Sequence, residues 1–271
     1  MRSALAEDRA SEDMTTRLLG AAAEGSAVGH FIAEDRFVVA GLPIADLVFR
    51  ELDSEACLEP HTREGNWTEV RTTIATVRGT TRALLAGERV ALNFLQRLSG
   101  IATLTRQAVD AVAGTAARIT HTRKTTPGLR RLEQYAVRVG GGVNNRASLA
   151  DAVLWKDNHW AMLVAARATL ADALATAPPG VLVMVEVESE AQLDEALAAG
   201  VRHLLADNQP PARVAGWVRR ASPGVTIQAS GGITPETARA YAEAGATLIS
   251  IGALTHSAPA AAVRLEIAVK S

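Results

Sequence analysis

The chain has 271 residues, and its 28 basic and 29 acidic side chains leave a formal net charge of −1. Because these charges balance, we expect neither a nucleic-acid partner nor an electrostatic attachment to a membrane surface. Hydrophobic residues make up 48% of the sequence, which is enough for the core of one large domain or of two modest ones.

The N-terminal segment predicts a protein that is not exported. Residues 1–13 are rich in charged side chains and are not followed by the apolar stretch of a signal peptide. No window along the chain approaches the ~18 uninterrupted apolar residues of a membrane span. The single cysteine, Cys57, cannot form an internal disulfide or a cysteine-rich zinc site, in agreement with a reducing compartment. We therefore expect a soluble, cytoplasmic protein.

Residues 1 to about 100 predict an α+β domain. Segments Phe37 to Ala40 and Thr68 to Gly79 alternate apolar and polar residues, as antiparallel strands with one exposed face do. Between them, Pro43 to Leu52 is typical of a helix. Glu88 to Leu98 places its apolar residues on one helical stripe and predicts a second helix.

From about residue 115 onward, short apolar runs alternate with alanine-rich helical segments. The predicted strands are 117–122, 152–155, 181–188, 203–207, 225–229 and 248–252, and the predicted helices are 190–199, 211–220 and 235–244. A unit of roughly 20 residues is typical of βα repeats, and fully apolar strands indicate a parallel sheet covered on both faces. Such units predict either a closed barrel or a doubly wound open sheet, because their period does not determine closure.

Polar residues follow these predicted strands at the points where the strands end. Because the carboxyl ends of parallel strands share one face, we expect the side chains there to converge, although any one of them alone is more often a solvated loop charge. The converging residues are Arg123, Lys124, Lys156, Asp157, Glu186, Asp207 and Ser230.

The charges of these residues indicate the kind of ligand. Together with Arg130 and Arg146, the cations have the composition needed to bind several carboxylates or phosphates. Glu186 and Asp207 form a carboxylate pair that can hold Mg²⁺, often through water and substrate oxygens.

Two glycine-rich segments are candidate anion sites. Ser230, Gly231 and Gly232 precede Pro235, which suits the first turn of a helix, so free N–H groups at that helix start attract an anion. Close helix packing explains the glycine pair equally well. Glycines 140–142 precede Asn145 and a basic residue, and an ordinary helix end is the alternative there. His159 is either a base, a substrate contact or a simple loop residue.

Several segments between residues 88 and 260 together form a family pattern. They are Glu88-Arg89, ALNFLQRLSGIAT (91–103), TRKTTPGLR (122–130), YAVRVGGGVNNR (135–146), LADAVLWKDNH (149–159), VEVE (185–188), ADN (206–208), ASGGIT (229–234) and ISIGALTHSAP (249–259). In order and spacing they resemble the quinolinate phosphoribosyltransferase family.

The resemblance implies a fold and an assembly. An N-terminal α/β sandwich over residues 1–100, to which the tail 260–271 is expected to return, precedes an incomplete, open TIM-like α/β barrel over residues 101–259. The assembly implied is a homodimer, or a higher assembly of dimers, in which the N-terminal domain of one subunit caps the barrel mouth of the other.

The resemblance also implies a reaction and its participants. The family joins quinolinate to 5-phosphoribosyl-1-pyrophosphate and releases pyrophosphate and CO₂, leaving nicotinate mononucleotide for NAD biosynthesis. Arg123, Arg146 and Lys156 are expected to bind the two ring carboxylates, and Arg89 to reach in from the neighbouring subunit. Mg²⁺ near Glu186 and Asp207 neutralises the pyrophosphate.

These implications give a complete set of expected site residues. The catalytic residues are Lys124, Lys156, Glu186 and Asp207, of which the last two are also the metal ligands. The substrate-binding residues are Arg89, Arg123, Lys124, Arg130, Asn145, Arg146, Lys156, Asp157, His159, Ser230, Gly231, Gly232 and Gly252.

The chain departs from the family pattern at four positions. His121 stands where the family usually has Asp, Asn145 where it has His, Ala206 where it has Leu, and Gln228 where it has Glu. Asn145 matters most, because that His normally belongs to the substrate pocket. The alternatives are therefore a paralogous phosphoribosyltransferase that uses another pyridine or aryl carboxylate, or a non-catalytic ligand-binding relative.

Overall fold

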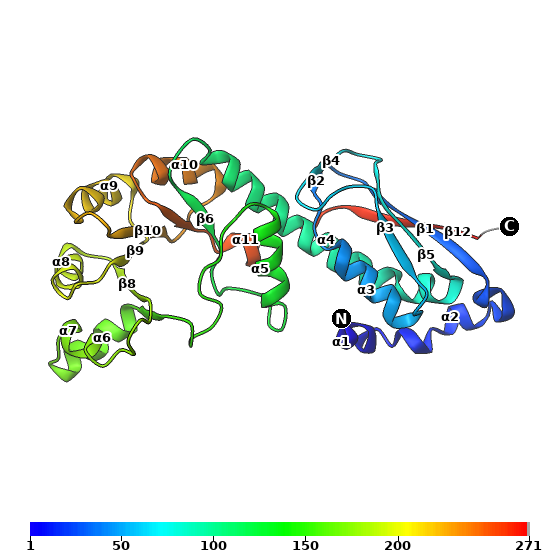
Figure 1. Cartoon of the computed structure of the whole chain (residues 1–271), viewed down its shortest axis with the longest axis horizontal. Helices are drawn as coiled ribbons and strands as arrows, with labels where there is room; N and C mark the ends of the chain where they lie inside the picture. Colours follow the sequence, from blue (N-terminus) through cyan, green and yellow to red (C-terminus); the bar gives the residue numbers. More distant parts are fainter. Residues whose placement is uncertain (270–271) are drawn as a thin grey trace. The chain divides into compact units, whose positions relative to one another are not determined.

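The computed structural model describes residues 1–269 and divides the chain into two compact units (Figure 1). Unit 1 contains Met1–Leu104 and the chain from Ala258 onward, and unit 2 contains Thr105–Ser257. The boundary therefore lies inside helix α4 (Thr81–Ala111), four residues beyond the predicted one at residue 100. Of the tail predicted to return to unit 1, Val263–Val269 forms strand β12, and residues 270–271 lie outside the described residues. Within residues 1–269, every helix is too short or too polar to cross a membrane.

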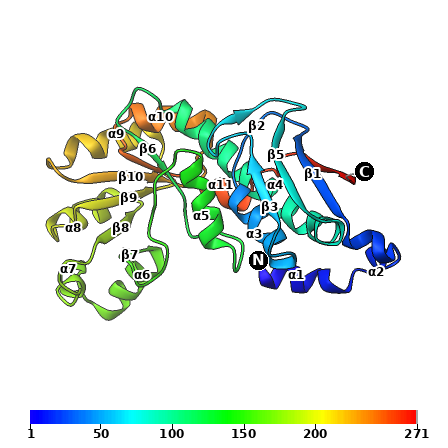
Figure 2. The same cartoon turned by 45° about the vertical axis from the view of Figure 1, so that its right-hand side comes forward.

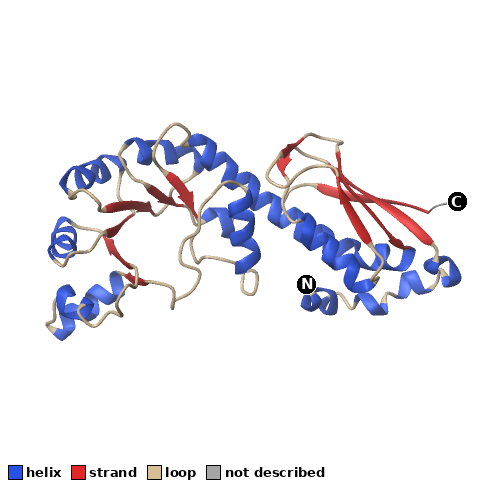
Figure 3. Cartoon of the chain, viewed as in Figure 1, coloured by secondary structure: helices blue, strands red, loops and turns tan. Residues whose placement is uncertain are grey.

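Unit 1 is built on an antiparallel sheet in the order β12-β1-β5-β3, with a small second sheet formed by β2 and β4 (Figure 3). Its other strands are β1 (Ser26–Ala33), β2 (Phe37–Val38), β3 (Cys57–Pro60), β4 (Trp67–Thr68) and β5 (Thr73–Thr80). Its helices are α1 (Arg2–Glu7), α2 (Met14–Arg17), α3 (Leu42–Leu52) and the first part of α4, with 3₁₀ turns η1 (Ala10–Glu12) and η2 (Gly20–Glu24).

One face of this sheet forms the core of unit 1. Along β1 every second residue is buried, as the two-residue period of a strand requires. Phe31 on that buried face meets Phe49 of α3 edge to face, with ring centroids 6.1 Å apart. Gly87 of α4 lies against the same ring, because a Cβ there would be 3.0 Å from Phe49.

Two sequence predictions for unit 1 were wrong in extent. The expected strand Thr68 to Gly79 is two strands, β4 and β5, because a turn at Arg71, whose φ is +64°, interrupts it. The expected helix Glu88 to Leu98 is the middle of the 31-residue helix α4. Gly100 in α4 leaves room for the returning chain, because a Cβ there would lie 3.0 Å from the carbonyl carbon of Pro259.

Unit 2 alternates parallel strands with helices. Its strands are β6 (Arg118–Thr120), β7 (Val153–Trp155), β8 (Val183–Val187), β9 (His203–Asp207), β10 (Thr226–Ser230) and β11 (Leu248–Ser250). Its helices, after the end of α4, are α5 (Arg130–Val139), α6 (Asp157–Ala166), α7 (Leu170–Leu174), α8 (Glu190–Ala198), α9 (Pro211–Arg220), α10 (Pro235–Glu243) and α11 (Ala253–His256). Helices α8, α9 and α10 lie on the outer face of the curved parallel sheet (Figure 2).

The strand order identifies the topology of unit 2. The order is β6-β11-β10-β9-β8-β7, and all neighbouring pairs are parallel. The first strand therefore lies beside the last one, which is the circular order of a barrel and not the reversal of a doubly wound sheet. Since β6 and β7 are the two edges of the sheet, the barrel is open between them. The predicted incomplete barrel is confirmed.

Candidate active site

A cavity of about 420 Å³ lies at the carboxyl ends of the parallel strands of unit 2. The segments that follow β6 and the ends of β7 to β11 supply its walls. The lining residues are Thr122, Arg123, Lys124, Asn145, Arg146, Leu154, Lys156, Met184, Glu186, Leu205, Asp207, Asn208, Ser230, Gly231, Gly232 and Ser250.

The register of the sheet explains why these side chains meet. Asp207 at the end of β9 pairs with Ser230 at the end of β10, and Glu186 on β8 pairs with Leu205 on β9. Because successive residues of a strand alternate between its two faces, residues two apart face the same cavity. Leu154 and Lys156 illustrate this spacing.

Ten of the expected site residues line the cavity together. They are Arg123, Lys124, Asn145, Arg146, Lys156, Glu186, Asp207, Ser230, Gly231 and Gly232. Of the remaining expected residues, Arg89 is exposed on α4 in unit 1, and the other four lie in unit 2 outside the lining of this cavity. The four are Arg130, Asp157, His159 and Gly252.

These four residues have structural contacts of their own. Arg130 donates from Nε to Oγ1 of Thr125 at 3.0 Å and from Nη1 to the carbonyl oxygen of Ala147 at 3.1 Å. Asp157 accepts from the backbone N–H of Asn158. Gly252 leaves room for His256, since a Cβ there would lie 3.1 Å from Nε2 of that histidine. Substrate contact by these residues stays a prediction.

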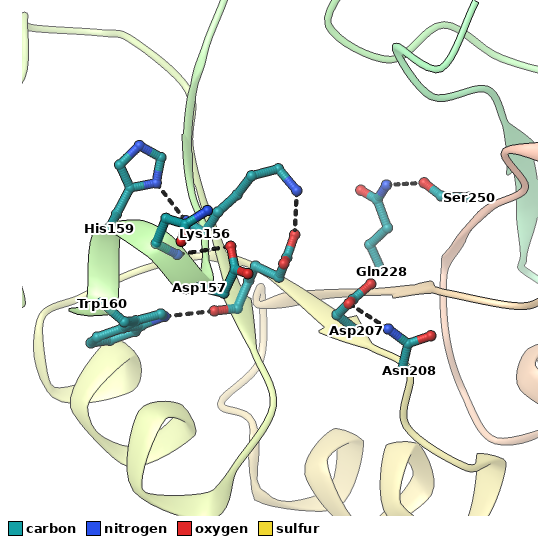
Figure 4. A network of polar contacts seen from close by, with 10 residues as sticks. Lys156, Asp157, His159, Trp160, Asp207, Asn208, Gln228 and Ser250 are labelled. Atoms are coloured by element: carbon teal, nitrogen blue, oxygen red, sulfur yellow. Dashed lines mark hydrogen bonds and ion pairs between the residues drawn. The ribbon is translucent and has the colours of Figure 1, made fainter. Parts of the chain in front are cut away.

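His159 stabilises the start of α6. Its Nδ1 accepts from the backbone N–H of Lys156 at 2.8 Å, so the ring satisfies a donor that a helix start leaves unpaired. The ring also packs on Trp155, with centroids 5.3 Å apart. Figure 4 shows the imidazole turned toward the Lys156 backbone.

Lys156 and Glu186 form the central ion pair of the cavity. The Nζ of Lys156 donates to Oε2 of Glu186 at 2.9 Å (Figure 4). The Glu186 side chain is only 7% exposed, whereas that of Lys156 is 45% exposed. Trp160 of α6 fixes the same strand end by donating its indole N–H to the carbonyl oxygen of Glu186 at 2.8 Å.

The surroundings of these groups shift their ionisation. Burial raises the pKa of the Glu186 carboxyl, the Lys156 ammonium opposes the rise, and Asp207 and Asp157 add to it. Burial lowers the pKa of the Arg146 guanidinium, and the nearby Arg123 adds to that effect. The cavity thus holds cations close enough to repel one another, and an anionic ligand relieves that repulsion.

The carboxylates are arranged for a hard cation. Glu186, Glu188 and Asp207 each offer an oxygen, and these oxygens lie within 4.8 Å of one another. An all-oxygen donor set of this kind suits Mg²⁺, which prefers carboxylate and water oxygens. Glu188 was not predicted as a ligand. Its position two residues after Glu186 was the signal, because residues at that spacing share a face of the strand.

Gly231 is required by its neighbour Asn208. Gly231 has φ +92°, and a Cβ at this position would lie 2.7 Å from the backbone nitrogen of Asn208 and overlap its side chain. Asn208 itself has φ +52° and donates from Nδ2 to Asp207 Oδ2 at 2.7 Å (Figure 4). The glycine therefore keeps the Asp207 strand end and the Ser230 loop in contact.

The four departures from the family pattern lie in three places. His121 and Asn145 touch each other at the cavity wall. Gln228 is 1% exposed inside the barrel, where its Oε1 accepts from Nε2 of His203 at 2.6 Å and its Nε2 donates to the hydroxyl of Ser250. Ala206 is buried on the other face of β9.

Sequence reasoning missed six uncharged residues of the lining. The residues missed are Thr122, Leu154, Met184, Leu205, Asn208 and Ser250. Leu154, Met184 and Leu205 each stand two residues before an expected charged residue, so strand alternation was an available signal for them.

Comparison with known proteins identifies the family. The model of the quinolinate phosphoribosyl transferase N-terminal domain matches residues 13–99, and that of the C-terminal domain matches residues 101–266. The chain belongs to the quinolinate phosphoribosyltransferase family. The resemblance stated from its motifs is thus confirmed.

Two relatives and one solved structure match this chain over nearly their whole length. The nicotinate-nucleotide pyrophosphorylase (carboxylating) of Mycobacterium leprae is 42% identical over 268 residues, covering 95% of this chain and 92% of the relative. The probable enzyme of the same name from Bacillus subtilis is 38% identical over 265 residues, covering 98% and 91%. The structure of NadC from Streptococcus pyogenes superimposes with a TM-score of 0.92 at 36% identity, covering all of this chain and 95% of that one.

Proposed function

We propose that this protein transfers the phosphoribosyl group of 5-phosphoribosyl-1-pyrophosphate to quinolinate with decarboxylation, giving nicotinate mononucleotide, CO₂ and pyrophosphate for NAD biosynthesis. One observation carries the proposal. A single cavity at the barrel mouth holds four cations, two carboxylates and a glycine-rich loop, which are the groups needed for a dicarboxylate and a pyrophosphate ester. The family and its similarly named relatives support the same reaction.

The cations of the cavity would bind the acid. Arg123, Arg146 and Lys156 pair with the two ring carboxylates of quinolinate, and Lys124 adds a fourth positive charge. The Nε of Arg123 is buried and has no hydrogen-bond partner among residues 1–269. Leaving a buried donor unpaired costs free energy. A substrate carboxylate oxygen that accepts from this Nε removes that cost and therefore binds more tightly.

The carboxylates and the glycine loop would bind the phosphoribosyl donor. Mg²⁺ held by Glu186 and Asp207, with Glu188 within reach, would neutralise charge on the pyrophosphate. Ser230, Gly231 and Gly232 present backbone to the same cavity just before α10, where a helix start attracts a phosphate.

The reaction then needs orientation and electrostatic stabilisation. The bond from ribose C1 to the pyrophosphate oxygen breaks with its electron pair leaving on oxygen, and the ring nitrogen of quinolinate supplies the pair for the new bond to C1. The ring nitrogen becomes positive, so it stabilises the carbanion that forms when the adjacent carboxylate leaves as CO₂. A proton then replaces the lost carboxylate. The chain's residues hold both reactants and compensate their charges, and no side-chain nucleophile is required.

The assembly forms part of the proposal. We place Arg89 of one subunit at the cavity of another in a homodimer, where it adds a cation to the acid site. Its exposure on α4 supports this role, because an exposed arginine is available to a partner.

The proposal is tested by incubating the purified protein with quinolinate, 5-phosphoribosyl-1-pyrophosphate and Mg²⁺ while measuring CO₂ and nicotinate mononucleotide. Equal amounts of both products, dependent on all three additions, are expected. Absence of both products from a folded protein would overturn the proposal.

A second candidate is the same transfer to another pyridine or aryl carboxylate. Asn145 favours it, because an amide lines the cavity where the family usually has His. Offering nicotinate and other ring acids in the same assay separates the two candidates. Faster turnover of one of these acids than of quinolinate would favour the second.

A further inference from the structure

We infer that His121 is a positioning residue: its neutral ring holds Asn145, and through it Arg146, at the acid-binding wall of the cavity. This role rests on the proposed function, since it concerns the binding of the ring acid. His121 does not line the cavity and is fully buried at the end of β6. It therefore acts through the residues that it contacts.

Two hydrogen bonds join His121 to the loop that carries Asn145. The backbone N–H of Asn145 donates to Nε2 of His121 at 3.3 Å, and the Asn145 side chain donates from Nδ2 to the His121 carbonyl oxygen at 3.2 Å. On the other side of the ring, Nδ1 lies 3.3 Å from the carbonyl oxygen of Thr122. The loop is thus attached to the end of β6 by both ring and backbone.

These partners select one protonation state of the ring. A backbone N–H can only donate, so the Nε2 atom that faces Asn145 must present its lone pair. A carbonyl oxygen can only accept, so the Nδ1 atom that faces Thr122 must carry the proton. Only the neutral Nδ1–H tautomer satisfies both partners. A cation would place a second N–H against the N–H of Asn145.

The surroundings favour the same neutral state. Burial lowers the pKa of His121, and Arg138 of α5 lowers it further, while hydrogen bonds to Thr122 and Asn144 oppose these effects. The neighbouring segments carry Arg123 and Arg146, which are also cations. Arg138, the charged group that shifts this pKa, therefore acts against protonation of the ring.

The attachment extends from Asn145 to Arg146. The Oδ1 of Asn145 accepts from the backbone N–H of Arg146 at 2.7 Å, and Nη1 of Arg146 donates to the carbonyl oxygen of Ala152 at 3.2 Å. Asn145 and Arg146 both line the cavity. A shift of the Asn145 backbone would therefore move two groups of the acid-binding wall, while the carboxylates on β8 and β9 stay in place.

Two matched variants separate positioning from core filling. The amide oxygen of His121→Gln can reach the place of Nε2 and accept from Asn145, whereas the shorter side chain of His121→Asn reaches only the place of Nδ1. We expect His121→Asn to raise KM for quinolinate about fivefold to tenfold, which corresponds to one lost neutral hydrogen bond. In His121→Gln this KM stays within about threefold of the natural value, and in both variants KM for 5-phosphoribosyl-1-pyrophosphate stays within about twofold.

A pH profile supplies a second readout. A protonated His121 ring cannot accept from Asn145, and burial lowers the pKa of this ring from its ordinary value of 6.5. The ratio of quinolinate KM between the natural protein and His121→Gln should therefore rise only at pH values below 6.5. The ionisation of quinolinate affects both proteins equally, so it cancels in this ratio. Equal loss in both variants, or no loss in a folded His121→Asn protein, would overturn the inference.

A direct measurement on the natural protein covers the case in which a variant fails to fold. The chain has six histidines, so ¹⁵N labelling of histidine resolves their ring nitrogens by NMR. We expect the His121 signals, assigned by their loss in His121→Gln or by their contact with Asn145, to report the Nδ1–H tautomer at neutral pH. An Nε2–H tautomer or a cation would overturn the inference. This readout does not need turnover, so it separates failure of the inference from failure of the proposed function.

Discussion

Lys156 and Glu186 lie on neighbouring strand ends with Nζ and Oε2 2.9 Å apart, and they link the part of the cavity proposed for the acid to the part proposed for the metal. The pair favours the charged form of the Glu186 carboxyl. Burial raises the pKa of Glu186, and the Lys156 ammonium limits that rise. Removal of Lys156 therefore changes the ionisation of Glu186 in the neighbouring part of the cavity.

Substituting Lys156→Met should destabilise the protein in a pH-dependent way. Without the cation, the pKa of Glu186 rises further above its ordinary value of 4.5. The Glu186 carboxyl of the folded state then holds its proton more tightly than that of the unfolded state does. The loss of stability is therefore small near about pH 4.5 and grows as the pH rises through the folded-state pKa. We expect a loss of about 1 to 2 kcal/mol near pH 8, reduced by the exposure of Lys156. Thermal unfolding at both pH values measures it.

Lys156→Arg is the control, because it keeps a cation beside Glu186 and should retain most of the stability. A loss of equal size at both pH values would show that the ionisation of Glu186 is not involved.

Replacing the carboxylates should impair one substrate more than the other. We expect Glu186→Gln with Asp207→Asn to lower kcat/KM for 5-phosphoribosyl-1-pyrophosphate by roughly 100-fold or more, because the ligands proposed for Mg²⁺ are lost. Quinolinate binding, measured by calorimetry, should change less than about threefold, since Lys156 is then free of its partner. Loss of quinolinate binding with the phosphoribosyl donor still bound would contradict this division of the cavity.

The sequence predicted the regular part of the barrel well. Strand β9 and helix α9 have the predicted bounds, because an apolar run and a helix start at Pro211 mark them locally. Strand β12 was not predicted as a strand. It pairs with β1 from the opposite end of the chain, and strand formation depends on such a partner more than on local preference.

The charged part of the cavity was predictable for a topological reason. Parallel strands end at one face, so the charges that follow them converge without knowledge of loop geometry. The contacts of His121 and Asn208 were not predictable in this way. The first depends on the return of the loop at Asn145, and the second depends on a positive φ and on the approach of Gly231.

Adjacent glycines offer a matched test of the loop proposed for phosphate binding. Gly231→Ala would push the new Cβ into Asn208. A Cβ on Gly232 meets no atom within 4 Å in the described structure, so Gly232→Ala adds only the backbone strain of an alanine at φ +62°. We expect Gly231→Ala to raise KM for 5-phosphoribosyl-1-pyrophosphate at least tenfold, and Gly232→Ala to cost about 1 kcal/mol of stability with a smaller effect on KM. Steady-state kinetics and thermal unfolding measure both. Equal kinetic effects would show that the Asn208 contact is irrelevant.

Arg89 and Lys156 should complement each other between subunits. Arg89→Ala and Lys156→Ala proteins are each expected to be inactive, but a mixed dimer contains one cavity with both residues intact. After random exchange of subunits, recovery should approach about one quarter of natural activity, since about half of the dimers are mixed and each has one intact site of two. The control mixes Lys156→Ala with Glu186→Ala, whose residues share one cavity, and should stay inactive. No recovery after demonstrated exchange would exclude the shared site.

Asn145→His should strengthen quinolinate binding, most clearly below about pH 6.5, where the new imidazole carries a charge. A charge-assisted hydrogen bond is worth about 1.5 to 3 kcal/mol against about 1 for a neutral one, so a gain on the order of tenfold is expected. The contact with His121 modifies this gain. The substitution removes the hydrogen bond from the Asn145 side-chain amide to the His121 carbonyl oxygen, and it places two imidazoles side by side.

Combining Asn145→His with His121→Asp should therefore bind quinolinate more tightly than Asn145→His alone, since the carboxylate accepts from the loop and favours the imidazolium. Calorimetry on the natural protein, both single variants and the double variant gives the coupling between the two positions. Independent effects would show that the two departures are unrelated. If Asn145→His weakens quinolinate binding and the natural protein turns over a different ring acid faster, Asn145 instead determines specificity for that acid.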